Sequence, residues 1–209
     1  MKRVFLSCSA ALLVMAAACD TPNDPRVEAT DGFGSNSLDV YGVVADSGNG
    51  WSIANGELIG TGPARHSLLL WNGVSIDNGW VEAESRRAED AGLVMKWIDN
   101  NTYYVLAFRD DSTKSGLSTQ NLALMRRTGG TFTTLQTKDV AWPRGTMHTV
   151  RFEATGTTFT VYFDGAVQFT VTEGASAQLP GRFGLRHNAT DATWVSTFDT
   201  FRWRVPLNR

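Results

Sequence analysis

Two carboxylates stand two residues apart in segment 79–86, where polar and apolar side chains alternate as in a β-strand. Alternate residues of a strand point to the same face, so we expect Glu82 and Glu84 to lie side by side. A retaining glycoside hydrolase needs a nucleophile and an acid about 5–5.5 Å apart. However, Arg86 and Arg87 follow after Ser85, and a nearby guanidinium group holds a carboxylate ionised so that it cannot donate a proton. The sequence therefore favours a polar strand face without a catalytic residue.

Other catalytic and metal-binding patterns are missing from the sequence. The histidines, His66, His148 and His187, are scattered, and no two have the spacing of zinc ligands. No serine stands in a nucleophile elbow, and no glycine-rich phosphate loop occurs. We therefore predict that the protein is not an enzyme.

Loop tryptophans are candidates for a binding site. Trp142 lies in the segment DVAWPRG at 139–145, and Trp194 follows the polar run HNATDAT at 187–193. An aromatic ring in a loop can stack on a sugar, although it can also fold over the edge of a sheet. We expect Trp142 and Trp194 to contribute to a carbohydrate-binding site.

Four charged residues are candidates for the polar part of the same site. Glu82, Glu84 and Lys96 occupy strand positions that should point away from the core, and Arg186 is expected to join them. The alternative is that this polar face is only solvated.

Period-two alternation indicates the elements that must position these residues. In segment 149–172 apolar residues alternate with polar ones over three stretches, and Asp164-Gly165 predicts a two-residue hairpin turn. No segment has a convincing helical period. Further strands are expected at 57–60, 66–71, 79–86, 91–98, 102–109, 119–127, 131–137, 181–187 and 193–205. Short strands without helices predict an all-β, antiparallel two-sheet sandwich or a barrel.

The amino-terminal segment is typical of export. Residues 1–18 have a basic start and an apolar run that is too short to span a membrane, and the run ends in small residues. Cys19 follows, in a pattern that resembles the bacterial lipobox, in which the cysteine is lipidated. Because Cys8 lies in the segment that would be removed, the mature chain has one cysteine and can form no internal disulfide. We expect a protein anchored in the bacterial cell envelope by its lipid alone.

The mature chain is acidic and forms one domain. Removal of Lys2 and Arg3 with the signal peptide leaves 17 basic against 21 acidic side chains, a net charge of −4, which argues against a nucleic-acid partner. Residues 19–30 are expected to be the lipidated cysteine and a short polar tether, and residues 31–209 the folded domain.

An ordered series of short patterns resembles the concanavalin A-like lectin/glucanase superfamily, close to its laminin G-like jelly rolls. The patterns are DGF at 31–33, WSIANGEL at 51–58, WVEAE at 80–84, AGLVMKWIDNNTYY at 91–104, HTVRF at 148–152, VYFDG at 161–165, GRFGLR at 181–186 and FDTF at 198–201. The resemblance implies a jelly-roll sandwich, and it admits sugar-binding modules, glycoside hydrolases, polysaccharide lyases and adhesion domains. Glucanases of this fold carry a third acid where this sequence has Arg86 or Arg87.

The same resemblance implies a structural calcium site. The FDTF pattern is similar to a motif whose aspartate binds Ca²⁺, which nominates Asp199, and Asp31 joins it if the first and last strands pair. Our hypothesis is a lectin-like lipoprotein that binds a glycan without cleaving it. The alternatives are a hydrolase or lyase of this superfamily and an adhesive lipoprotein with an unidentified protein partner.

Overall fold

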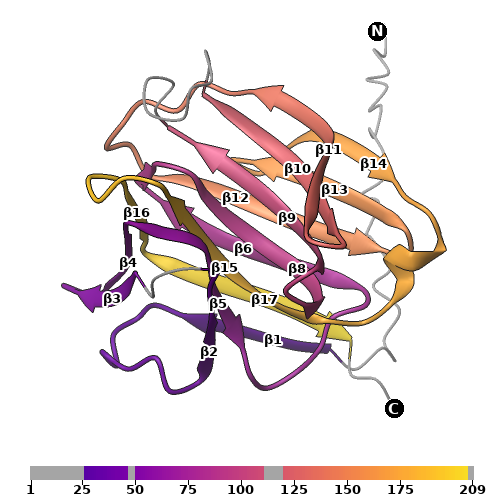
Figure 1. Ribbon diagram of the computed structural model, residues 1–209, viewed down its shortest axis with the longest axis horizontal. Coiled ribbons are helices and arrows are strands. Elements are labelled where there is room, and N and C mark those ends of the chain that lie inside the picture. The colour runs from indigo at the N-terminus through magenta and orange to yellow at the C-terminus, as the bar shows by residue number, and fades with distance from the viewer. Residues whose placement is uncertain (1–25, 47–49, 111–119, 207–209) are drawn as a thin grey trace, which may run out of the picture.

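The computed structural model describes residues 26–46, 50–110 and 120–206, and these residues form an all-β structure (Figure 1). Besides strands, the described segments contain one short 3₁₀ turn, η1 (Ala175–Gln178). None of their helical segments has the length and hydropathy of a membrane crossing. The predicted all-β class is confirmed.

Two antiparallel sheets make up the sandwich, and a smaller sheet closes one end. The six-stranded sheet has the order β1 (Arg26–Asp31), β17 (Thr200–Pro206), β6 (Gly79–Ser85), β12 (His148–Thr155), β13 (Thr158–Phe163) and β14 (Ala166–Thr172). The seven-stranded sheet has the order β11 (Thr131–Asp139), β10 (Asn121–Thr128), β9 (Thr102–Arg109), β8 (Ala91–Asp99), β15 (Arg182–Ala189), β5 (Ala64–Trp71) and β2 (Tyr41–Val44). The four-stranded sheet has the order β3 (Trp51–Ala54), β4 (Glu57–Thr61), β16 (Val195–Phe198) and β7 (Arg87–Ala88).

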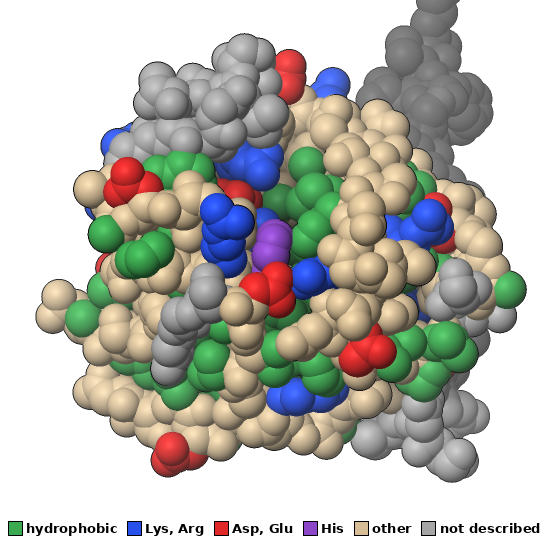
Figure 2. Space-filling view, in the orientation of Figure 1, with side chains coloured by type: hydrophobic (Ala, Val, Ile, Leu, Met, Phe, Trp, Pro, Cys, Tyr) green, Lys and Arg blue, Asp and Glu red, His purple; other side chains and the backbone are tan. Residues whose placement is uncertain are grey.

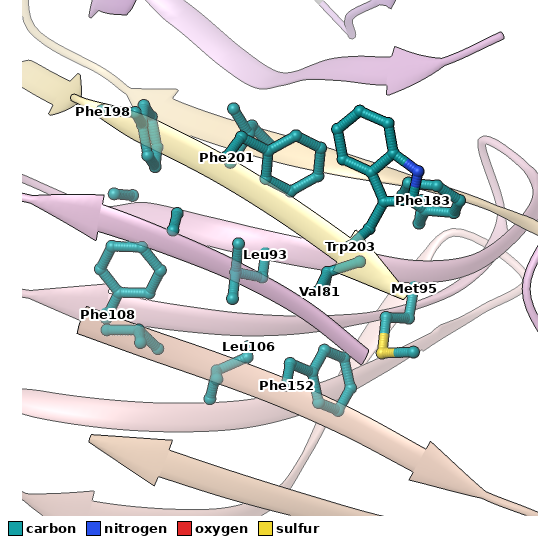
Figure 3. Packing of buried hydrophobic residues seen from close by; sticks show 14 of the residues in the cluster. Val81, Leu93, Met95, Leu106, Phe108, Phe152, Phe183, Phe198, Phe201 and Trp203 are labelled. Atoms are coloured by element: carbon teal, nitrogen blue, oxygen red, sulfur yellow. The ribbon is translucent and has the colours of Figure 1, made fainter. Parts of the chain in front are cut away.

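The main core lies between the six- and seven-stranded sheets. Period-two alternation turns Val81 and Phe152 inward from one sheet and Leu93 and Leu106 inward from the other, and all four side chains are fully buried (Figure 3). Trp203 on β17 extends this cluster and is also buried. Burying a phenylalanine or leucine side chain contributes about 1.5–3 kcal/mol, so this core accounts for the stacking of the two sheets.

The meander predicted over 149–172 is confirmed as β12, β13 and β14. At its hairpin, Asp164 and Gly165 have φ of 49° and 77°. Both values are positive, as a type I′ turn requires.

The predicted tether is wrong for residues 26–30. Arg26–Asp31 forms β1, which pairs along its whole length with β17. Val27 and Ala29 are half-buried against the core, so this strand gains apolar burial that its polar composition does not reveal. Cys19 and the expected signal peptide lie outside the described residues.

Candidate functional site

The acidic pair Glu82 and Glu84 lies on the outer face of the six-stranded sheet. Both are ion-paired with Arg202 on the neighbouring strand, at 3.1 Å from Glu82 and 2.9 Å from Glu84. Arg151, on the other side, donates its Nε–H to Glu82 at 2.8 Å. These arginines donate to the carboxylate oxygen atoms and so occupy them. The pair therefore forms part of a charged strand face.

Lys96 and Arg186 do not lie with that pair, so the predicted four-residue site is wrong. Both are on the seven-stranded sheet and are 2% exposed. The Lys96 ammonium group donates hydrogen bonds to the carbonyl oxygens of Gly156, at 3.3 Å, and Ala177. Burial lowers the pKa of Lys96. Lys96 ties η1 to the sheet and does not present its charge to solvent.

The expectation of an exposed Trp142 is also wrong. Its side chain is fully buried, and its ring stacks on Phe108 with centroids 5.4 Å apart and planes inclined by 10°. Phe163 and His148 contact the same ring at 5.3 Å each. The loop folds so that the Trp142 ring covers the end of the core. Burial of this large apolar ring stabilises the domain, and the ring is therefore not available to stack on a sugar.

Trp194 is half-buried in a turn, where its N–H donates to the carbonyl oxygen of Asp191 at 3.2 Å. Its carbonyl oxygen accepts a hydrogen bond from the N–H of Gly62 at 3.3 Å. The turn is fixed in place, and a sugar contact at Trp194 remains a prediction.

The two predicted calcium ligands lie near the pairing of the first and last strands. Asp31 Oδ1 accepts the N–H of Phe33 at 2.7 Å, and Oδ2 accepts the hydroxyl of Tyr41 at 2.8 Å. Asp199 lies 4.0 Å from Arg86 Nη2. Within residues 26–46, 50–110 and 120–206 no group of three or more His, Cys, Asp or Glu side chains is arranged to hold a metal. With the oxygens of Asp31 engaged in the protein, these residues fit a calcium ion poorly, and the ion remains a prediction.

A different group of polar side chains lies on the outer face of the seven-stranded sheet, and the backbone is strained at two of them. His66 and Asp90 have φ of 46° and 68°, although neither is glycine. Each costs roughly 1–2 kcal/mol in this conformation. Asn188 joins the two positions, since its Oδ1 accepts the N–H of His66 at 3.1 Å and its Nδ2 donates to Asp90 Oδ2 at 2.6 Å. Strain of this kind persists where the fold holds side chains in fixed positions.

Asp90 is the centre of a buried charge network. Its Oδ1 accepts Arg186 Nη1 at 2.9 Å and lies 3.3 Å from Arg109 Nη2. Burial alone raises the pKa of Asp90, but the two guanidinium groups outweigh burial and hold the pKa below its usual range. Two arginines thus share one ionised carboxylate.

Aromatic rings lie beside this network. The Phe132 ring centroid is 4.8 Å from that of His66 and 5.9 Å from that of Tyr103. Arg127 lies over Phe132, with its Cζ 5.2 Å from the ring centroid. It also donates Nη1–H to the Tyr103 hydroxyl at 3.2 Å and pairs through Nη2 with Asp46 at 3.1 Å. Burial, followed by the charge of Arg186, lowers the pKa of His66 to about 4, so the imidazole is neutral at pH 7.

These contacts show that the outer face is concave. Asp46 is held beside β5, because its N–H donates to the Arg65 carbonyl oxygen at 3.2 Å, whereas Arg127 lies on β10. Four strand spacings separate β10 from β5, about 19 Å in a flat sheet. An arginine side chain joins them only if the sheet curls.

Three small residues, Gly92, Ala107 and Ala123, lie on this surface, and all three are buried. In Figure 2 a histidine lies near the centre of the viewed face, beside basic and acidic side chains and hydrophobic surface. We define the concave face by the following residues: His66, Asp90, Arg109, Arg127, Phe132 and Arg186.

Of these six, only Arg186 is predicted from the sequence as a binding residue. Among the other five residues, the sequence pattern pointed to Arg109. One face of β9 carries the alternate residues Tyr103, Val105, Ala107 and Arg109. The last of them is charged and contacts Asp90, the centre of the buried network. His66 gives no local signal, because its place depends on a positive φ and on a strand pair distant in sequence.

Comparisons with solved structures support the fold. The chain is similar to carbohydrate-binding module CBM66 from Bacillus subtilis, with 13% identity, a TM-score of 0.58 and coverage of 80% of this chain and 92% of that one. It is similar to a Bacillus licheniformis β-glucanase, with 14% identity, a TM-score of 0.59 and coverage of 84% and 97%. It is also similar to the κ-carrageenase of Pseudoalteromonas carrageenovora in complex with an oligotetrasaccharide of κ-carrageenan, with 13% identity, a TM-score of 0.58 and coverage of 92% and 100%.

No protein-family model matches the sequence, and no curated protein matches it. The similarity to solved structures therefore rests on the arrangement of strands. The fold is the concanavalin A-like jelly-roll sandwich that the sequence patterns imply.

Proposed function

We propose that this protein is an exported, lipid-anchored glycan-binding protein that holds its ligand on the concave face and does not cleave it. The observation that carries the proposal is that aromatic rings and fixed charged groups share one concave surface. A sugar has apolar ring faces and a rim of hydroxyl groups, so its site needs both aromatic and polar partners. The similarity to a carbohydrate-binding module and to a carrageenase in complex with an oligosaccharide supports the choice of ligand class.

Binding without cleavage is supported by the state of the acids. Asp90 has a lowered pKa and is ion-paired, so it cannot act as a proton donor near neutral pH. Asp46 is paired with Arg127. Glu82 and Glu84 lie on the six-stranded sheet, where both are paired with Arg202. An acid and a nucleophile across one glycosidic bond are not available from these four carboxylates.

The anchor follows from the export segment and Cys19. We expect Cys19→Ala to abolish fatty-acid labelling and to block normal processing, as measured by metabolic labelling and mass spectrometry of the mature amino terminus. An unmodified amino terminus in the wild-type protein would contradict the anchor and leave glycan binding unaffected.

Retention on a panel of immobilised polysaccharides tests the binding site. Phe132→Ala removes an aromatic ring from the concave face, and Phe169→Ala is the matched control. Both rings are half-buried on edge strands, β11 and β14, but they belong to different sheets. We expect Phe132→Ala to weaken retention at least tenfold, because truncation of a binding hot spot costs about 2 kcal/mol or more. Phe169→Ala should retain the wild-type affinity.

Three results would count against the proposal. Equal losses in both variants would show that the ligand is bound elsewhere. Release of reducing sugar or of an unsaturated product would make the protein a hydrolase or lyase. Retention of no polysaccharide, with a defined protein partner bound instead, would favour the adhesive alternative.

A further inference from the structure

Two guanidinium groups of the concave face share one carboxylate. The described side chains on this surface include the guanidinium groups of Arg109, Arg127 and Arg186 and the carboxylates of Asp46, Asp90 and Asp139, the last of which is in register with Asn121, the strand partner of Arg109. Asp90 serves both Arg109 and Arg186. His66 lies on the same surface and is neutral at pH 7, so it adds no positive charge to the concave face. Arg109 therefore shares its carboxylate with Arg186, which lies closer to it.

The two guanidinium groups that share Asp90 are poorly solvated by water. The side chains of Arg186 and Arg109 are 2% and 13% exposed. The Nε–H groups of both arginines are buried and have no hydrogen-bond acceptor among the described residues. Buried donors in folded proteins nearly always find an acceptor. Arg109, the more exposed of the two, is the one that a ligand placed on the concave face can reach.

We propose that the concave face selects glycans that carry carboxylate or sulfate groups, with Arg109 as the residue that pairs with the anion; this rests on the proposed glycan-binding function. An oxygen anion offers several acceptors to a guanidinium group, and such charge-assisted hydrogen bonds are about twice as strong as neutral ones. The arginines are already fixed by Asp90 and by tight packing, so little side-chain entropy is lost on binding.

The net charge of the chain implies that selection of an anionic glycan depends on short-range contacts at the concave face. The mature chain has more acidic than basic side chains, so long-range attraction does not draw polyanions to it. Discrimination must come from the contact between one acidic group and the concave face. A second consequence is that binding weakens at high salt less steeply than for a protein with a broad basic surface.

The experiment compares acidic polysaccharides with chemically neutralised forms of the same backbone. The full chain is titrated with polygalacturonate and its methyl ester, alginate and carboxyl-reduced alginate, and κ-carrageenan and its desulfated form. We expect at least one acidic member to bind tenfold or more tightly than its neutral partner. Arg109→Gln should lower that ratio about tenfold.

Arg204→Gln is the matched control, because Arg204 is a partly exposed arginine on the six-stranded sheet, 4.0 Å from Glu28. It should keep the wild-type ratio, and the melting temperatures of both variants establish that they are folded. Equal binding of acidic and neutral members, or an Arg109→Gln ratio equal to wild type, overturns the selection of anions and leaves glycan binding intact. Binding to no polysaccharide, including the neutral panel, overturns both proposals. Binding of acidic peptides in place of acidic glycans would assign the same arginines to a protein partner and overturn the glycan assignment.

Discussion

Asp90→Asn isolates the electrostatic contribution of the buried charge network. Asparagine has nearly the same shape as aspartate and tolerates positive φ, so the substitution keeps the backbone at φ 68° and removes only the charge. Arg186, at 2% exposure, then loses the carboxylate that it contacts at 2.9 Å. Breaking a buried ion pair by removing one partner costs about 3–5 kcal/mol. That is a large part of the 5–15 kcal/mol by which a domain is typically stable.

Urea unfolding followed by tryptophan fluorescence measures this loss. With an m value of about 2 kcal/mol per molar, the midpoint should fall by roughly 2 M. Asp99→Asn is the control, because Asp99 is exposed at the end of β8 and an amide oxygen can still accept the Asn101 N–H that Oδ1 accepts at 2.7 Å. It should change stability by less than about 0.5 kcal/mol.

The double variant Asp90→Asn/Arg186→Met tests the cause. If an unpaired buried charge is responsible, the double variant should be more stable than the sum of the two single losses predicts. A loss below about 1 kcal/mol for Asp90→Asn alone would refute the reasoning, since it would mean that solvent or Arg109 rearrangement compensates for the missing carboxylate.

Gly165→Val should destabilise the hairpin by about 1–3 kcal/mol, because Gly165 has φ of 77° while the space around its Cβ position is open. Gly174→Val is the control, because the space at Gly174 is equally open but its backbone is extended. Equal melting temperatures for the two variants would contradict the prediction. Stability should fall between about pH 6.5 and 4, because burial lowers the pKa of His187 and His66 to about 4 and the unfolded chain binds these protons first. From pH 7 to 5 the loss for the fully buried His187 should be about 2 kcal/mol, with less from the partly exposed His66, and chemical denaturation with an unchanged midpoint at the two pH values would rule this out. Chelation should lower the melting temperature if Asp199 holds a structural calcium ion, and Asp199→Asn should abolish that response; a wild-type melting curve that ignores both chelator and added Ca²⁺ would leave Asp199 without a metal.

Local alternation was sufficient to predict most strands and much of the core. Phe152 and Val161 are both apolar residues in period-two segments, and both are fully buried. The Asp164-Gly165 turn was predictable for a similar reason, because left-handed backbone conformation depends on the residue itself and its immediate neighbours.

Local pattern did not determine where the chain changes sheet. Segment 193–205 was expected as one strand, but Asp199 interrupts it, and its N–H donates to the Glu84 carbonyl oxygen at 2.9 Å. β16 then belongs to the four-stranded sheet and β17 to the six-stranded one. Polar and apolar residues alternate in the same way in β16 and β17. Which sheet each strand joins therefore depends on which neighbouring strand has backbone N–H and C=O groups left to pair.

The burial of apolar side chains was predictable on strands and misleading in the loops. Trp142 stands in a polar loop beside proline, and the composition indicated exposure. Its burial depends on Phe108 and Phe163, which come from other parts of the chain and leave a space of suitable size at the end of the core. No local property of the loop contains that information.

The sequence by itself determined that the protein is all-β, because alternation and turn residues act over a few positions. The predicted export segment and lipidation site, Cys19, likewise rest on patterns of adjacent residues. Only the tertiary structure placed Glu82 and Lys96 on different sheets and brought His66 within 4.8 Å of Phe132, although the latter two are on β5 and β11. The curl of the seven-stranded sheet makes that contact, and it results from the packing of many strands together, so no single segment specifies it.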